Sequence, residues 1–145
     1  MNQVFILPTV MVVMVLAFFG GHEALTKVLT GTGGENTLVG TDRADHLKGR
    51  RGADRLWGSR GKDHLIGNRG NDRLLGSRGN DKIFPGEGND KVNAGYGDDL
   101  IYARDTDGVD YIDCGPGFDE VETIHRDDKT LSNCERALGP RLGHI

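Results

Sequence analysis

A nine-residue repeat fills the middle of this chain and restricts its possible folds more than any other feature. Counted in nines from Gly31, the eighth position is aliphatic in all eight copies, and the sixth is Asp in every copy except the first, which has Asn36. The eighth positions are Leu38, Leu47, Leu56, Leu65, Leu74, Ile83, Val92 and Ile101. The fourth position is glycine except at Arg43, and the first is glycine up to Gly76. Such fixed spacing indicates a repeat architecture.

One aliphatic residue in nine cannot supply a conventional core, but stacked coils would align these residues into a thin inner row, each coil burying its neighbour. Glycines at two fixed positions allow tight turns. A helix is excluded because two glycines in nine residues would cost about 2 kcal/mol per repeat. Disorder would account for the 23 glycines among 145 residues, but not for the fixed aliphatic positions.

The pattern resembles the Gly-Gly-x-Gly-x-Asp-x-aliphatic-x nonapeptide of RTX (hemolysin-type) calcium-binding proteins, closely over residues 31–102 and less regularly to about residue 130. The resemblance implies an all-β fold, a parallel β-roll that forms a right-handed β-helix-like solenoid. Two nonapeptides would make one 18-residue coil. Glycines of the turns would supply flexibility and backbone ligands: Gly49, Gly52, Gly58, Gly61, Gly67, Gly70, Gly76, Gly79, Gly86, Gly88, Gly95 and Gly97.

Coils stack at the ordinary strand spacing of about 4.8 Å, so aspartates 18 residues apart should form ladders on two edges. One edge would hold Asp45, Asp63, Asp81 and Asp99, and the other Asp54, Asp72 and Asp90. Bare ladders repel, whereas Ca²⁺ between coils would bind carboxylate and carbonyl oxygens. Pairing neighbours gives about five calcium sites: 45/63, 63/81, 81/99, 54/72 and 72/90. The alternative is that each Asp merely caps a turn, which explains one repeat but not the ladder.

After Tyr102 the repeat slips by two residues within Arg104–Gly108 and then resumes, with further calcium ligands expected at Asp110 and Asp119. The chain has two cysteines, Cys114 and Cys134. In an exported chain such a pair usually forms a disulfide; free thiols or a metal site are the alternatives, but no further Cys or His ligand stands at zinc-like spacing. The resemblance implies that the pair ties a cap onto the end of the roll.

The N-terminal run from Val4 to Phe19 has no charged residue and is typical of a secretory signal, cleaved or kept as an anchor. We therefore expect four parts: residues 1–24 as signal peptide or membrane anchor, 25–30 as linker, 31–121 as calcium-binding β-roll, and 122–145 as C-terminal cap and tail. The protein would be extracellular or at the cell surface, touching a membrane only through an uncleaved N-terminal segment.

The net charge of −4 hides an uneven distribution: residues 42–91 hold 12 Lys/Arg against 8 Asp/Glu, and residues 92–135 hold 3 against 12. The third position of the repeat carries Arg51, Arg60, Arg69 and Arg78. Two interpretations compete: a solvated rim that offsets the aspartates, or a cationic stripe that binds anionic cell-surface polysaccharide. Nucleic-acid binding is not expected, because the aromatic residues do not interleave with the basic stripe.

Large ninth-position residues should face outward and could form an association surface, although such residues are usual in the family. They are Trp57, Ile66, Leu75, Phe84 and Tyr102. His46 and His64 should stack as a surface pair. Arg43, Arg50 and Asn36 depart from the family pattern, which weakens the case for calcium sites in the first coils.

No hydrolase or metalloprotease motif is present, so we expect no enzyme. The sequence predicts a monomeric, exported roll that folds on binding Ca²⁺, with a structural or adhesive role. The alternative is a non-catalytic calcium-responsive module, or the partner of a separate secreted enzyme or toxin.

Overall fold

The computed structural model describes residues 26–105, 107–123, 128–130, 133–134 and 136–138, and over these residues it is built from strands without a helix. The strands are β1 (Val28–Thr30), β2 (Thr37–Val39), β3 (His46–Arg51), β4 (Arg55–Arg60), β5 (His64–Arg69), β6 (Arg73–Arg78), β7 (Lys82–Glu87), β8 (Lys91–Tyr96), β9 (Leu100–Ala103), β10 (Tyr111–Asp113), β11 (Glu120–Thr123), β12 (Lys129–Thr130) and β13 (Arg136–Leu138). None of the described segments could span a membrane as a helix.

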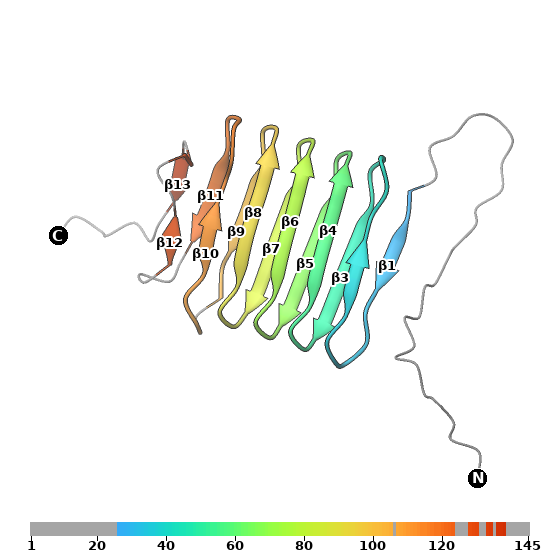
Figure 1. Ribbon diagram of the computed structural model, residues 1–145. Coiled ribbons are helices and arrows are strands. Elements are labelled where there is room, and N and C mark those ends of the chain that lie inside the picture. The colour runs from blue at the N-terminus through green and yellow to red at the C-terminus, as the bar shows by residue number, and fades with distance from the viewer. Residues whose placement is uncertain (1–25, 106, 124–127, 131–132, 135, 139–145) are drawn as a thin grey trace, which may run out of the picture.

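The strands form two parallel sheets, and the chain alternates between them. Sheet A has the order β1-β3-β5-β7-β9-β11-β13, and sheet B the order β12-β10-β8-β6-β4-β2. Each pair of consecutive strands therefore completes one coil, and Figure 1 shows the coils side by side from β1 to β13. This arrangement confirms the predicted parallel β-roll.

The register of the parallel strands places the aliphatic residues of successive coils next to one another in the core. In sheet A, Leu47 pairs with Leu65 and Leu65 with Ile83, each 18 residues apart. Sheet B stacks the alternate copies in the same way. The buried apolar residues form one cluster: Leu29, Leu38, Leu47, Leu56, Leu65, Leu74, Ile83, Val92, Ala94, Ile101, Ala103, Ile112, Cys114 and Val121. Each coil contributes a few apolar side chains, so the core is stabilised by stacking rather than by any single coil.

The central strands, β3 to β8, are each six residues long and so include most of the nine positions of a repeat. They run from the seventh position of one repeat to the third position of the next, and only the fourth to sixth positions remain as a turn. Residues at the eighth and first positions face inward and are buried, whereas those at the seventh and ninth face outward. Trp57 and Leu75 are accordingly exposed, as predicted.

The roll extends beyond both predicted boundaries. β1 lies within residues 25–30, which the sequence analysis assigned to a linker, and its Leu29 is buried in the core. The run before Gly31 thus supplies a first strand that pairs with β3. At the other end, β12 and β13 continue both sheets into the region assigned to the cap. The predicted signal or anchor lies outside the described residues.

The two-residue insertion is absorbed between β9 and β10. Lys91 pairs with Tyr111, and Leu100 with Glu120, so the spacing rises from 18 to 20 for this coil while both sheets continue. Cys114 and Cys134 form a disulfide, as predicted. Cys134 packs against the core cluster near the C-terminal end of the roll.

Candidate metal centre

The sixth-position aspartates are the most regular polar feature of the roll. Each precedes a strand, and each side chain is no more than 1 % exposed: Asp45, Asp54, Asp63, Asp72, Asp81, Asp90, Asp99, Asp110 and Asp119. They are brought together in two ladders, one on each edge of the roll, as the 18-residue spacing predicts. Burial of nine carboxyl groups in a roll this thin requires a compensating interaction for each one.

One oxygen of each ladder carboxyl is used to connect coils. The backbone N–H of Asp45 donates to Oδ1 of Asp63 at 2.8 Å, and that of Asp63 donates to Oδ1 of Asp81 at 2.7 Å. The other edge repeats this geometry at 2.7 Å from Asp54 to Asp72 and from Asp72 to Asp90. Both ladders continue across the insertion to Asp110 and Asp119, at 3.0 and 2.8 Å.

The second oxygen is different. Oδ2 is buried and has no hydrogen-bond partner in six of the carboxyl groups: Asp54, Asp63, Asp72, Asp81, Asp90 and Asp99. An unpartnered buried carboxylate oxygen is costly, and in the absence of a cation the group responds by holding its proton. These oxygens are therefore available to a metal or to a proton.

Burial raises the pKa values of the ladder carboxyl groups. Desolvation raises the pKa of Asp81 to about 7, against the lowering effect of its backbone hydrogen bond with Asp63, and the charges of Asp63 and Asp99 raise it further. Desolvation likewise raises the pKa of Asp90 to about 8, again with like-charged ladder neighbours adding to the rise. The same cause raises the pKa values of three further ladder residues to about 6: Asp54, Asp63 and Asp99.

Backbone oxygens lie next to these carboxyl groups. A Cβ placed on Gly67 would overlap both Oδ2 of Asp72 and the carbonyl oxygen of Pro85, one coil further on. A Cβ on Gly76 would overlap Oδ2 of Asp81 and the carbonyl oxygen of Ala94. At Gly67 and Gly76 the absence of a side chain leaves room for carboxylate and carbonyl oxygens that converge from the same and the adjacent coil.

This donor set fits calcium. Ca²⁺ takes carboxylates and backbone carbonyls with flexible geometry, whereas structural zinc sites are built from Cys and His ligands. Within the described residues there is no cluster of three or more His, Cys, Asp or Glu that could hold a metal, so carbonyl oxygens would have to complete each site. The ladders supply one carboxylate per turn, and the carbonyl oxygens nearest to them are those of first-position residues such as Pro85 and Ala94.

Left-handed backbone marks the turns. The fourth-position glycines have positive φ from Gly52 to Gly97. The second position also has positive φ, but there this chain carries larger residues in four copies: Arg50, Ser59, Asn68 and Ser77, at 80 to 90°. Such conformations cost about 1–3 kcal/mol each for residues other than glycine. Gly86 and Gly95 relieve this strain in the later coils.

A second hydrogen-bond ladder at the fifth position was missed by the sequence analysis. Oδ1 of Asn71 accepts the N–H of Asn89, and Oδ1 of Asn80 accepts that of Asp98. The earlier copies have Ala44, Ala53 and Lys62 instead, so this support exists only in the C-terminal half. The signal was present, since Asn and Asp share one position of the repeat from residue 71 to residue 98.

The main ladder also has ends that the sequence analysis missed. The N–H of Asp110 donates to Oδ1 of Asp128 at 3.1 Å, and the N–H of Lys27 donates to Oδ1 of Asp45 at 2.7 Å. Counting nine residues on from Asp119 would have found Asp128. In the first coil Oδ1 of Asn36 accepts the N–H of Thr32 at 2.6 Å and so closes its own turn.

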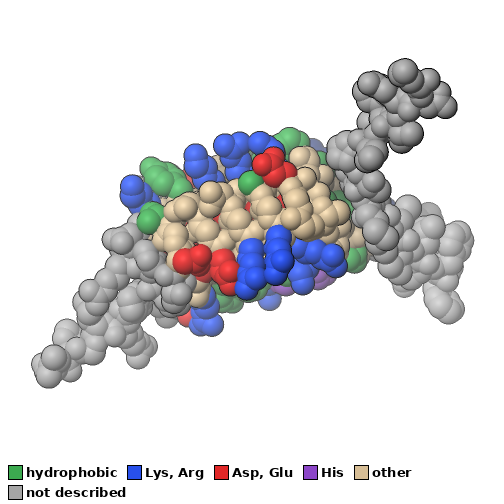
Figure 2. Space-filling model, turned by 90° about the horizontal axis from the view of Figure 1, so that it is seen from below, with side chains coloured by type: hydrophobic (Ala, Val, Ile, Leu, Met, Phe, Trp, Pro, Cys, Tyr) green, Lys and Arg blue, Asp and Glu red, His purple; other side chains and the backbone are tan. Residues whose placement is uncertain are grey.

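The four arginines do not form one stripe. Arg51 pairs with Arg69 in sheet A, and Arg60 with Arg78 in sheet B. Arg69 bonds to Glu87 at 2.9 Å, and Arg60 reaches Asp42 at 3.5 Å. Lys and Arg side chains flank a central strip of turn atoms on both sides in Figure 2. Arg60 and Arg69 therefore offset acidic side chains at the rim of the roll. His46 and His64 lie beside each other in neighbouring strands as predicted, with ring centroids 5.3 Å apart in an edge-to-face arrangement.

The family model described as RTX calcium-binding nonapeptide repeat, which represents four copies of the repeat, matches residues 30–65, 57–92 and 84–121. No curated protein and no solved structure matches the chain. The matched region extends over residues 30–121, which is most of the roll. Its fold and its aspartate ladders are those expected of a calcium-binding repeat. This chain belongs to the RTX calcium-binding nonapeptide repeat family.

Proposed function

We propose that this protein is an exported, monomeric β-roll that folds on binding about five Ca²⁺ ions between its coils, and that it has a structural or adhesive role outside the cell. The observation that carries the proposal is the row of buried, unpartnered Oδ2 atoms on both edges. Without a cation, these carboxyl groups repel one another and resist burial. With calcium, the same oxygens would hold neighbouring coils together.

Calcium would be held by Asp45, Asp63, Asp81 and Asp99 on one edge and by Asp54, Asp72 and Asp90 on the other, with Asp110 and Asp119 extending the ladders. Carbonyl oxygens of the glycine turns would complete the ligand sets. The first coils would bind most weakly, since Asn36 replaces Asp there and strained second-position residues such as Arg50 precede the early turns.

Export is supported by the uncharged N-terminal run of the sequence and by the disulfide, because disulfides persist in oxidising compartments outside the cytosol. A chain that becomes ordered only when it reaches calcium would stay unfolded inside the cell, where calcium is scarce. The proposed role is non-catalytic, with the roll itself as the functional unit.

Equilibrium binding of radioactive calcium to the purified protein tests the metal assignment, with magnesium as competitor. We expect several Ca²⁺ per chain and little displacement by an equal concentration of Mg²⁺, which demands a rigid octahedral site. The variant Asp54→Asn should bind fewer ions, whereas Asp42→Asn, at an exposed aspartate outside the ladders, should not. One Ca²⁺ per chain or fewer would contradict the proposal. Recovery of the protein from culture medium tests export.

A further inference from the structure

We propose that the outer face of sheet A binds a chain of an acidic polysaccharide, one whose sugars carry carboxylates beside hydroxyl groups. The inference rests on the proposed calcium-dependent folding, because the face is assembled from four successive coils and exists only in the folded roll. It identifies the chemistry of an adhesive ligand.

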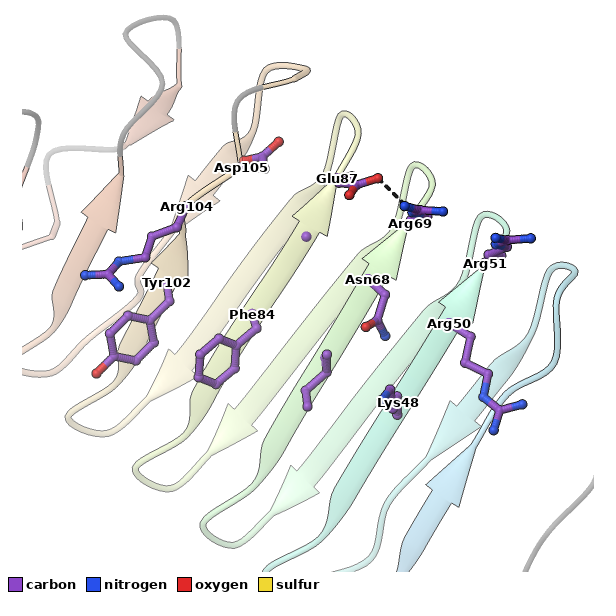
Figure 3. A pocket seen from close by; sticks show the side chains of 12 residues that line it. Lys48, Arg50, Arg51, Asn68, Arg69, Phe84, Glu87, Tyr102, Arg104 and Asp105 are labelled. Carbon is purple, nitrogen blue, oxygen red and sulfur yellow. Dashed lines mark ion pairs between the residues drawn. The ribbon is translucent and has the colours of Figure 1, made fainter.

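The face carries an open hollow of about 620 Å³ that crosses β3, β5, β7 and β9. Three rows of side chains line it, each running along the roll axis through residues in register. The first row is Lys48, Ile66, Phe84 and Tyr102; the second is Arg50, Asn68 and Gly86; the third is Arg51, Arg69 and Glu87. Arg104 and Asp105, which follow β9, complete the lining at the opposite end from β3. Figure 3 shows cations gathered over β3 and the two aromatic rings over β7 and β9. A linear ligand along the axis would meet both.

The cationic end of the hollow lacks anions of its own. Among the described residues, no ion pair is formed by Lys48, Arg50 or Arg51. Arg51 also stands in register beside Arg69, so two guanidinium groups occupy neighbouring strands about 4.8 Å apart. Like charges in adjacent register are destabilising. A carboxylate lying across both would remove this repulsion, and Arg binds carboxylates through two parallel hydrogen bonds.

The other end of the hollow provides an apolar floor. The rings of Phe84 and Tyr102 lie parallel with centroids 4.9 Å apart, and His64 packs edge-on against Phe84 at 5.1 Å. Both rings are half-buried and held by their neighbours. They give the C–H face of a sugar ring a fixed apolar surface, while Asn68 and Glu87 can accept hydrogen bonds from its hydroxyl groups.

Single-stranded nucleic acid fits this lining less well. Bases stack on aromatic faces, but here Phe84 and Tyr102 pack against each other and leave no gap for a base between them. Glu87 also presents a carboxylate, which can accept hydrogen bonds from hydroxyl groups, and these are far more numerous on a polysaccharide than on a nucleic acid. Sheet B has a smaller hollow, of about 340 Å³, and its paired third-position arginines, Arg60 and Arg78, are not part of it.

The arginine pairs of the two sheets allow a matched test. The double variant Arg51→Gln/Arg69→Gln removes two charges and the ion pair with Glu87, and the control Arg60→Gln/Arg78→Gln removes two charges and the ion pair with Asp42. The probe is an octamer of galacturonic acid, with its methyl ester as the uncharged counterpart. Binding is measured by calorimetry on the full chain at a free calcium concentration fixed by a calcium buffer, and far-UV circular dichroism is recorded on the same samples.

We expect the acid octamer to bind and the ester to bind at least about tenfold more weakly. Added salt should lower the affinity for the acid octamer but not for the ester. The sheet A variant should lose about tenfold in affinity, and the sheet B control less than about twofold. Equal losses in both variants, equal binding of the ester, or tighter binding of an oligothymidylate of the same charge would overturn the inference. If the chain is β-rich in calcium but does not bind the octamer, the glycan site is refuted and the calcium-dependent folding is not. If the octamer binds but the chain shows no calcium-dependent folding, the proposed folding on calcium is refuted and the glycan site is not.

Discussion

The substitution Asp63→Asn should change stability in opposite directions with and without calcium. Asp63 stands in the middle of one ladder: its Oδ1 accepts the N–H of Asp45, its own N–H donates to Asp81, and its Oδ2 is unpartnered. Asparagine keeps an oxygen for the first of these bonds and removes the charge. The variant therefore separates the charge of the ladder from its hydrogen bonds.

Without calcium, the variant should be more stable than the parent at neutral pH. Burial raises the pKa of Asp63 from 3.8 to about 6, a rise of about two units, which corresponds to at most about 3 kcal/mol. Solvent beyond the thin turn screens part of this charge, so we expect a gain of about 1 kcal/mol. With calcium the sign reverses: each site lost removes about 2.7 kcal/mol when calcium is at a hundred times its dissociation constant, and Asp63 would belong to two sites.

Urea unfolding followed by far-UV circular dichroism measures both values, in excess calcium and in excess chelator, with sucrose in both to populate the folded state. Asp42→Asn is the control, since it removes an exposed carboxylate of the same kind. Equal destabilisation of Asp63→Asn in both conditions would refute the reasoning, because Asp63 would then act only as a hydrogen-bond cap. No effect in either condition would refute it as well.

Three further outcomes follow from the same geometry. Because burial raises the pKa of Asp81 to about 7 and of Asp90 to about 8, above the unfolded value of 3.8, their contribution to the stability of the calcium-free roll is complete below about pH 4 and is lost as pH rises through about 7 to 8. Urea unfolding of the chelated protein in sucrose measures this, and a lower urea midpoint at pH 5 than at pH 8.5 would contradict it. Gly67→Ala should cost more than about 2 kcal/mol, since its Cβ would overlap a backbone carbonyl, whereas Gly33→Ala, which meets nothing within 4 Å, should change the urea midpoint little. Replacing Cys114 and Cys134 by Ser should lower the free energy of unfolding by about 3 kcal/mol, measured in calcium; an unchanged midpoint would show that the disulfide does not stabilise the roll.

Much of the fold could be predicted from the sequence because the repeat is strict. Aliphatic residues every nine positions specify the core row, and the 18-residue coil places Asp63 beside Asp81. The same period also implies that Arg51 and Arg60 lie on different sheets, so the split of the arginine set was within reach of sequence reasoning.

Other features required coordinates. The hydrogen bond from the N–H of one coil to Oδ1 in the next depends on side-chain orientation, which no repeat pattern specifies. Burial of the second carboxylate oxygen and the rise in pKa follow from that orientation. The hollow on sheet A combines ninth-position residues such as Phe84 with second- and third-position residues such as Arg50 and Arg51, and only the strand register shows that these rows form one surface.

The calcium dependence of folding is tested most directly by far-UV circular dichroism of the protein during a calcium titration, with a parallel magnesium titration. We expect a disordered spectrum in chelator, a cooperative rise of β signal with calcium, and little change with magnesium. A chain that is equally β-rich in chelator would contradict the central claim, because the aspartate ladders would then be tolerated without a metal ion.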